Sequence, residues 1–240
     1  MVRNNLGRFF VKFSVLLKLR NRISENFPSY FYFPSYSQWG EDAVISQFLH
    51  SKVGSYIDIG SGHPVKGNNT YFLYQRGWTG ILIDPIAVNV ELTKKYRPKD
   101  EILQRIVSNS IDSLDFWEFY NYRISTTNSN RAKLLLDQEE SLKAKYSVTS
   151  ISLSKIISNY DIQTKVMPEL LSIDVEGSEL EVLSSNDWNI FNPRVVCIEI
   201  LNECLTEELF RNNEVFSFLF SKGYVLRASV GNSQIFIKDN

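Results

Sequence analysis

Two acidic side chains stand where a buried strand is expected to meet a helix. The run LLSIDVEGSELEVL, residues 170–183, begins as a continuous apolar stretch and ends with helical spacing, and Asp174 and Glu176 lie between the two halves. A charged carboxylate is costly to bury, so acids at the mouth of a sheet indicate a functional site. Glu199 ends the next expected strand and could converge on the same place.

Converging carboxylates support two kinds of chemistry. One carboxylate can act as a general base that takes the proton of an acceptor hydroxyl group. Several together can bind a hard divalent cation such as Mg²⁺ or Mn²⁺, which lowers the pKa of a bound hydroxyl group. We predict Asp174 and Glu176 as catalytic residues, and Asp174, Glu176 and Glu199 as the ligands if a metal is used. As structural alternatives, Glu176 could cap the helix that follows it, and Glu199 could pair with Arg194 or a lysine.

A glycine turn follows an earlier apolar strand. In IDIGSGHP, residues 57–64, Asp58 precedes Gly60 and Gly62, and these two glycines let a ligand approach the backbone closely. A dinucleotide-binding turn has a third glycine where this chain has Val65, and the Gly-Lys-Ser/Thr of a phosphate-binding loop is absent from the sequence. The turn therefore does not suit a ligand that carries a pyrophosphate.

A further acid, Asp84, ends the next expected strand, TGILID. An acid at this place can accept hydrogen bonds from the hydroxyl groups of a ribose. The glycine turn together with this acid suits a nucleoside without a pyrophosphate, and S-adenosylmethionine is the candidate that we infer.

His63 directly follows the glycine turn. A histidine there could act as a catalytic base or as a metal ligand. It could equally hydrogen-bond the backbone and hold the turn beside Pro64. We predict a catalytic role for His63 and keep the structural role as the alternative.

The elements that must position these groups alternate between strands and helices. Strands are expected at residues 55–59, 79–84, 101–108, 115–122, 147–152, 170–175, 194–200, 224–230 and 234–239. Helices are expected at residues 37–49, 68–77, 88–96, 131–146, 153–160, 178–185 and 205–222. This alternation predicts a mainly parallel sheet with helices on both faces, in which ligands bind beyond the carboxyl ends of the strands. The last two strands form a hairpin that adds an antiparallel strand.

Length, charge and cysteine content narrow the class of protein. The 240 residues suffice for one sizeable α/β domain, and the formal net charge of −1 argues against a dedicated nucleic-acid-binding protein. Cys197 and Cys204 form neither a CxxC pair nor a disulfide framework, which fits a reducing compartment such as the cytoplasm.

The N-terminal residues differ in composition from the rest. Every charged side chain in residues 1–23 is basic, and apolar side chains recur there at helical spacing. The uncharged runs within residues 1–23 are too short to span a bilayer. This helix could lie on an anionic membrane surface, or it could pack on the domain or on a second subunit. We therefore divide the chain into a basic amphipathic helix with its lead-in, residues 1–36, and an α/β domain, residues 37–240.

Four segments, taken in order, resemble a known protein family. The segments SQWGED, IDIGSGHP with the following NNTYFLYQRGWTGILID, VTSISLSKII and LLSIDVEGSELEVL look like the FkbM family of S-adenosylmethionine-dependent methyltransferases. The resemblance covers about residues 37–200. The chain departs from the family pattern mildly, with Ser61 in place of an alanine and Asn68 in place of a serine.

This resemblance implies a class I methyltransferase fold, which is a Rossmann-like α/β structure. Its sheet has seven mainly parallel strands with an antiparallel C-terminal strand, and helices cover both faces. The resemblance also implies that Asp58, Gly60 and Gly62 shape the pocket for the methionine part of the cofactor.

Further cofactor contacts carry over by position. The resemblance implies that Asp84 binds the ribose and that Ser108 lies near the adenine. Gln38 and Thr70 are candidates for contacts with the carboxylate or amino group of the cofactor.

The resemblance further implies methylation of a hydroxyl group on a small molecule or glycan. The expected acceptor is a sugar hydroxyl in polysaccharide biosynthesis, on a glycan or glycolipid precursor. We expect a cytoplasmic protein that contacts the inner face of the membrane if residues 1–23 bind lipid, with a homo-oligomer as a further option. The alternatives are an NAD-dependent oxidoreductase, against which Val65 argues, and a catalytically silent binding protein.

Overall fold

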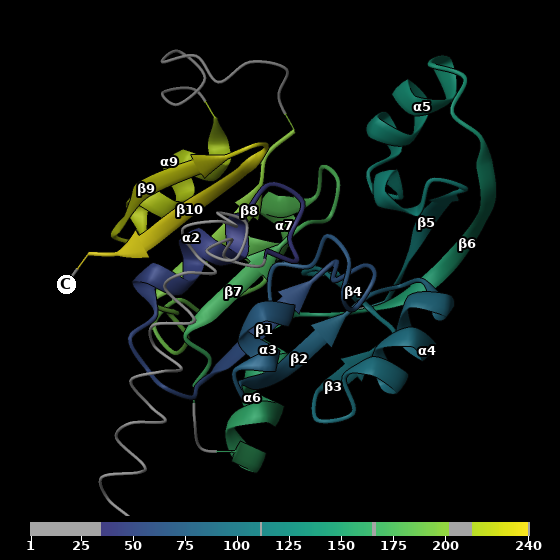
Figure 1. Ribbon diagram of the computed structural model, residues 1–240. Helices are drawn as coiled ribbons and strands as arrows, with labels where there is room; N and C mark the ends of the chain where they lie inside the picture. The colour runs from purple at the N-terminus through teal and green to yellow at the C-terminus, as the bar shows by residue number, and fades with distance from the viewer. Residues whose placement is uncertain (1–34, 111, 165–166, 202–212, 240) are drawn as a thin grey trace, which may run out of the picture. The chain divides into compact units, whose positions relative to one another are not determined.

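Seven strands form a mainly parallel sheet in the computed structural model, which describes residues 35–110, 112–164, 167–201 and 213–239 (Figure 1). The strands lie in the order β3-β2-β1-β7-β8-β10-β9. Their bounds are β1 Ser55–Ile59, β2 Thr79–Ile83, β3 Glu101–Leu103, β7 Leu170–Ile173, β8 Val195–Glu199, β9 Tyr224–Val230 and β10 Ser233–Lys238. Strand β10 runs antiparallel to both of its neighbours, and the other pairs are parallel. The predicted seven-stranded sheet with an antiparallel C-terminal strand is confirmed.

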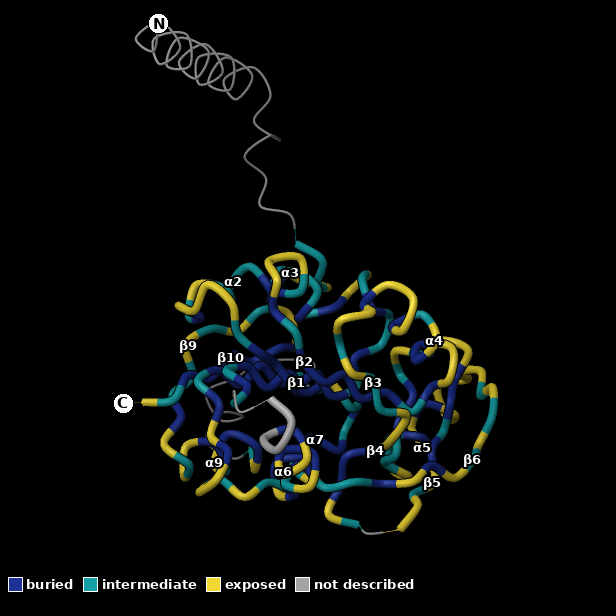
Figure 2. Tube along the Cα trace, turned by 90° about the horizontal axis from the view of Figure 1, so that it is seen from below, coloured by how far each residue is buried: buried dark blue, intermediate teal, exposed yellow. Residues whose placement is uncertain are grey.

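Helices cover both faces of this sheet, as predicted. Of the described helices, two pack on one face and three on the other, so the trace of the buried strands runs between two layers in Figure 2. The helices of the first face are α2 Glu41–Phe48 and α3 Tyr71–Gln75; those of the second are α6 Leu153–Thr164, α7 Glu179–Ser184 and α9 Glu214–Ser221. Because neither face meets water, every residue of β1 and of β7 is buried, and both strands are apolar at most positions.

A smaller sheet of three strands, in the order β4-β6-β5, stands beside the first (Figure 1). Its elements and the helices near it are α4 Ala87–Tyr96, β4 Ile106–Val107, β5 Ser113–Phe119, the 3₁₀ helix η2 Tyr122–Ile124, α5 Ser129–Asp137 and β6 Leu142–Ile151. A separate core of Ile86, Ile106, Phe116 and Val148 lies beneath it. We call residues 113–151, which lie between the parallel strands of the main sheet in sequence, the insertion.

The helix predicted for residues 131–146 is wrong in its second half. Helix α5 ends at Asp137, and residues 142–151 form β6. Side chains of β6 alternate between less and more exposed along most of its length, and the strand pairs with β5. Leu, Lys and Ala also favour helices, so the composition of this segment indicated a helix. The segment forms a strand because its side chains alternate in exposure and its backbone pairs with β5.

The strand predicted for residues 101–108 is two strands in two different sheets. Strand β3 pairs with β2 in the main sheet, whereas β4 pairs with β6 in the smaller one. The chain changes sheet at Gln104 and Arg105, where Arg105 N donates to the Leu103 carbonyl at 3.1 Å. An unbroken apolar pattern cannot show such a change of partner.

The first helix begins later than predicted. It starts at Glu41 instead of residue 37, after Gly40 in a left-handed conformation. Ser37 still serves the helix start, because its hydroxyl accepts hydrogen bonds from Gly40 N at 3.2 Å and Asp42 N at 3.3 Å.

Some predictions fall on residues that the structure does not describe. The basic helix of residues 1–23 is one, and residues 205–212 of the predicted helix 205–222 are another. Among the described helices, none is both long enough and apolar enough to pass through a bilayer.

Candidate active site

A pocket of about 340 Å³ opens at the carboxyl ends of the parallel strands. It is lined by Gly60, Gly62 and His63 after β1, by Asp84 after β2, by Asp174 and Glu176 after β7, and by Glu199 at the end of β8. Ligands of open α/β sheets bind at this edge, and the volume lies within the range of small-molecule sites. The structure therefore brings together most of the residues that the sequence singled out.

A larger and more open hollow of about 1000 Å³ lies elsewhere, lined by serines and asparagines from residues 109–110, 150–155 and 184–189. It contains none of the carboxylates whose pKa is strongly perturbed. Perturbed titratable groups in a concave site indicate chemistry, so we place the active site at the smaller pocket.

Three carboxylates meet in this pocket, as predicted. One oxygen each from Asp174, Glu176 and Glu199 lies within 4.8 Å of the others. The carboxyl group of Glu199 lies beside that of Asp174. We call these three residues the acidic cluster. Arg194, the partner considered for Glu199, instead donates its Nε–H to the Phe48 carbonyl at 2.7 Å.

Burial and mutual repulsion raise the pKa values of Asp174 and Glu176. The pKa of Asp174 lies well above its usual range because protein atoms surround the carboxyl group and Glu199 lies beside it, although the pocket leaves the residue accessible to solvent. Burial, with the nearby charge of Glu199, raises the pKa of Glu176 to about 8, and Arg131 opposes this shift. Carboxyl groups in this range can exchange protons near neutral pH.

Residues of the insertion hold the acidic turn that carries Glu176. Glu176 has a φ of 55°, in the left-handed region, which is unfavourable for a residue with a side chain. The Thr126 hydroxyl donates to the Glu176 carbonyl at 2.8 Å, and Asn128 Nδ2 donates to the Gly177 carbonyl at 2.8 Å. Arg131 Nη2 lies 3.5 Å from Glu176 Oε2. These contacts keep the strained turn in place and give Glu176 a cationic neighbour.

The glycine turn packs directly on the backbone of the acidic turn. Gly60 has a φ of 74°, and a Cβ atom there would lie 1.7 Å from the Asp174 carbonyl oxygen. Asp174 N donates in turn to the Ile59 carbonyl at 2.9 Å. Glycine is therefore required at position 60, because a side chain would separate the two turns that build the pocket.

Asp84 anchors the other end of the glycine turn. Its carboxylate accepts hydrogen bonds from Gly62 N and Ile86 N, each at 2.8 Å, and from Asn89 Nδ2. Burial raises the pKa of Asp84 to about 7. Asp84 lines the pocket beside the turn, where the proposed ribose contact would lie.

The contacts of His63 favour its structural alternative. His63 Nδ1 accepts hydrogen bonds from Val65 N and Lys66 N, both at 3.1 Å. Burial and the charges of Lys66 and Arg123 lower the pKa of His63, which keeps the imidazole neutral. A neutral ring that accepts at Nδ1 carries its proton on Nε2, so Nε2 is a donor in this tautomer and no base.

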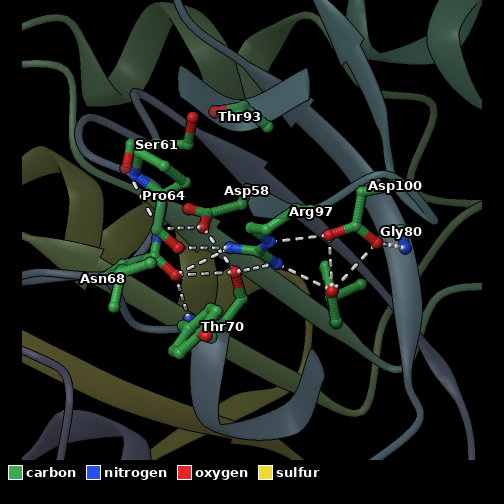
Figure 3. Close-up of polar contacts among 12 residues, drawn as sticks. Asp58, Ser61, Pro64, Asn68, Thr70, Gly80, Thr93, Arg97 and Asp100 are labelled. Carbon is green, nitrogen blue, oxygen red and sulfur yellow. Dashed lines mark hydrogen bonds and ion pairs between the residues drawn. The ribbon is translucent and has the colours of Figure 1, made fainter. Parts of the chain in front are cut away.

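Asp58 and Thr70 lie outside the pocket lining, in a buried polar network around Arg97 (Figure 3). Arg97 Nη2 donates to Thr70 Oγ1 at 3.0 Å, and Thr70 Oγ1 donates to Asp58 Oδ2 at 2.7 Å. Arg97 Nη1 donates to Asn68 Oδ1 at 2.9 Å. Burial raises the pKa of Asp58, and Arg97 opposes this shift. These contacts support the glycine turn from beneath.

The same guanidinium group bonds residues of the main sheet. Arg97 Nε lies 2.7 Å from Asp100 Oδ2, and both side chains are fully buried. Arg97 Nη2 also donates to the Tyr56 hydroxyl at 2.7 Å. The sequence analysis missed Arg97, because an arginine at the end of a helix and before a proline reads as a surface charge.

The remaining two predicted cofactor residues occupy different places. Gln38 lines the pocket and accepts a hydrogen bond from Arg123 Nη1 at 3.0 Å. Ser108 lies outside the lining, where its hydroxyl accepts from Ser110 N at 3.2 Å. The sequence analysis also missed Arg123 and Arg131, because residues 113–147 of the insertion, which carry them, match no motif.

A comparison with protein families decides the family. The family described as Methyltransferase FkbM domain matches residues 53–226, which is more than half of the chain. The chain belongs to the FkbM methyltransferase family. It is therefore an S-adenosylmethionine-dependent methyltransferase, and the alternative of an NAD-dependent oxidoreductase is rejected. The class I methyltransferase fold inferred from the resemblance agrees with the strand order of the main sheet.

Other comparisons return distant similarities. A TehB-like S-adenosylmethionine-dependent methyltransferase from Corynebacterium glutamicum is 10% identical, with a TM-score of 0.42 over 92% of this chain and 97% of that chain. The 1,6-didemethyltoxoflavin-N1-methyltransferase from Burkholderia thailandensis, solved with S-adenosylhomocysteine, is 9% identical, with a TM-score of 0.44 over 95% of this chain and 90% of that chain. A search of curated proteins found no significant match. Conclusions about this FkbM methyltransferase rest on its family and its own geometry.

Replacing Arg97 by methionine is expected to destabilise this FkbM methyltransferase by about 3–5 kcal/mol, the range for breaking a buried ion pair from one side. Asp100 would be left buried without its cation, and Tyr56 and Thr70 would each lose a hydrogen bond. Urea unfolding monitored by circular dichroism would measure the loss. Arg76→Met is the control, since the Arg76 side chain is exposed and lies over the Phe72 ring. A loss below about 1 kcal/mol for Arg97→Met would contradict the assigned role of the network.

Raised carboxyl pKa values make the stability depend on pH with a definite sign. Asp174 and Glu176 hold protons in the folded state that they release in the unfolded state, where their pKa values are ordinary. The free energy of unfolding should therefore fall as pH rises from about 4.5 through the folded-state pKa of about 8 for Glu176.

We expect Asp174→Asn to flatten that fall, because the amide removes one of the repelling charges. At pH 8.5 its melting temperature should exceed that of the unmodified protein by about 2–4 °C for every kcal/mol of repulsion relieved. Asp115→Asn is the matched control, since Asp115 forms an exposed ion pair with Lys145 at 2.7 Å. Melting curves at pH 5.5, 7 and 8.5 test this, and parallel pH profiles for the three proteins would refute it.

Proposed function

We propose that this methyltransferase transfers the methyl group of S-adenosylmethionine to a hydroxyl oxygen. The observation that supports this is the acidic cluster, in which three carboxylates meet in one pocket with the glycine turn. An alcohol is a weak nucleophile and must lose its proton as it attacks the methyl carbon. A cluster of carboxyl groups that share protons can accept that proton.

Asp174 is the residue best placed to accept the proton. It directly follows β7, it is accessible through the pocket, and its carboxyl group lies beside that of Glu199. Two carboxyl groups in contact tend to hold one proton between them, so one remains ionised and can act as the base. The acceptor oxygen bonds to the methyl carbon as the bond from carbon to sulfur breaks, and its proton passes to the carboxylate. Gly60 packs on the Asp174 carbonyl, so the glycine turn that would receive the cofactor lies directly beside this acid.

A divalent cation is a second way to use the same residues. Oxygens on opposite sides of an octahedral Mg²⁺ lie about 4.2 Å apart, and those around Ca²⁺ somewhat farther. The 4.8 Å span of the acidic cluster is close to these values. Glu176 Oε2 and Glu199 Oε2 are buried and have no hydrogen-bond partner among the described residues. These residues would therefore fit a cation, which when bound would lower the pKa of an acceptor hydroxyl group.

The acceptor that we propose is a sugar hydroxyl of a glycan or glycolipid precursor in the cytoplasm. This rests on the hydroxyl acceptors that the resemblance to the FkbM family implies and on the basic, apolar residues 1–23, whose composition suits contact with an anionic membrane. The net charge of −1 favours such an acceptor over a nucleic acid.

Methyl transfer from labelled S-adenosylmethionine to sugars, nucleotide-linked sugars and lipid-linked sugars tests the proposed reaction. Asp174→Asn is expected to lower kcat by about 10²–10⁴-fold, the usual contribution of a general base, while the affinity for S-adenosylmethionine stays within about twofold. Asp115→Asn should retain full activity. Labelling of nitrogen or sulfur acceptors alone, or of none, would refute O-methylation.

Chelation separates the two uses of the acidic cluster. If the carboxylates hold a cation, EDTA should abolish turnover and Mg²⁺ or Mn²⁺ should restore it. Full activity in EDTA would assign the proton transfer to Asp174 without a metal.

A further inference from the structure

Arg123 contacts two segments that lie far from it in the sequence, the residues before α2 and the loop between β1 and α3. It belongs to η2 in the insertion, and its Nη1–H donates to Gln38 Oε1 at 3.0 Å. A Cβ atom at Gly67, whose φ is 66°, would lie 2.6 Å from Arg123 Nη2. The guanidinium group therefore occupies the space that the missing side chain of Gly67 leaves open.

The residue before Arg123 makes a similar approach to the same turn. A Cβ atom at Gly62 would lie 3.6 Å from the Tyr122 ring. Tyr122 and Arg123 thus lie against Gly62 and Gly67, two of the three glycines in the loop between β1 and α3. Gln38, Gly62, Gly67, Tyr122 and Arg123 all line the pocket.

The cations of the pocket are not equivalent. Besides Lys66 of the turn itself, the lining includes Arg105, Arg123 and Arg131. Arg131 lies 3.5 Å from Glu176, and Arg105 follows β3, where its Nη1 donates to the Gln104 carbonyl at 2.9 Å. Of these three arginines, Arg123 is the one that lies against Gly67, in the loop that continues from the glycine turn.

The cofactor brings an anion to this part of the pocket. S-adenosylmethionine carries an α-carboxylate at the end of the methionine chain that is farthest from the ribose. Asp84, the candidate ribose residue, is bonded to Gly62 N, so the methionine chain would leave the ribose along the glycine turn. The carboxylate would be repelled by Asp84 and by the acidic cluster, and it needs a cation within reach.

We propose that Arg123 binds the α-carboxylate of S-adenosylmethionine, with Gln38 holding its guanidinium group in position. A guanidinium group can donate two parallel hydrogen bonds to a carboxylate, which lysine cannot reproduce. The insertion then contributes to cofactor binding through Arg123 as well as holding the acidic turn. The proposal rests on the cofactor and not on the identity of the acceptor.

Calorimetric titration without acceptor tests this with two ligands that differ only in the carboxylate, S-adenosylmethionine and decarboxylated S-adenosylmethionine. Arg123→Ala should weaken binding of the first by about 10–100-fold, the loss expected for a charged hydrogen bond, and change binding of the second by less than about twofold. Arg123→Lys should recover part of the affinity. Gln38→Ala should give a smaller loss, again confined to the ligand with the carboxylate.

Arg76→Ala removes an exposed arginine outside the pocket and should leave both affinities unchanged. Binding of the decarboxylated ligand by Arg123→Ala reports that its pocket is intact, so a folding defect cannot imitate the expected result. An equal loss for both ligands would overturn the proposal, because Arg123 would then support only the turn. An unchanged affinity for S-adenosylmethionine would also overturn it and would leave Arg123 free to contact an anionic acceptor. None of these outcomes depends on whether the enzyme methylates a hydroxyl group.

Discussion

The buried guanidinium group of Arg97 is the interaction on which the cofactor turn depends. Its partners come from β1, from the loop that follows the glycine turn and from the residues before β3. A buried charge is tolerated only when its partners surround it, so leaving any of them unpaired is costly. The path of the loop is therefore fixed by the fold before any ligand binds. Asp58, which the family pattern places at the cofactor, acts in this structure from beneath the loop through Thr70 and Asn68.

A second constraint joins this loop to the acids. Gly60 lies so close to the Asp174 carbonyl that the ends of β1 and β7 form one continuous backbone surface. The insertion packs against this surface from the side. Thr126 and Asn128 donate hydrogen bonds to the acidic turn, and Arg123 lies against Gly67 in the loop after the glycine turn. Cofactor turn and acidic cluster are thus joined to each other by backbone contacts and held from the side by buried side-chain hydrogen bonds. Precise alignment of donor and acceptor is what methyl transfer requires of the protein.

The sequence was enough to predict the structure at positions where a residue type has one physical explanation. Apolar strands, glycines with positive φ and acids at strand ends can be read from their order, and they predicted the main sheet and most of the pocket. The sequence was not enough where the structure of a residue depends on a partner that lies far away in the chain. Strand β6 exists because β5 pairs with it, and Arg97 is buried because Tyr56 and Asp100 accept its hydrogen bonds. The tautomer of His63 likewise depends on hydrogen bonds from two backbone amides, and no residue pattern predicts these bonds.

Two arginines show how the fold separates structural acids from reactive ones. Arg97 lies 2.7 Å from Asp100, and no part of either side chain is exposed. Burial raises the pKa of Asp100 and Arg97 opposes this shift, but Asp100 lies outside the pocket lining. Arg131 lies 3.5 Å from Glu176 and provides one positive charge beside three carboxylates. Neutralising that cluster fully would lower its pKa values and remove its ability to take up a proton. Incomplete neutralisation leaves the pKa values of Asp174 and Glu176 raised, at the cost of stability, and a carboxylate with a raised pKa is a stronger base.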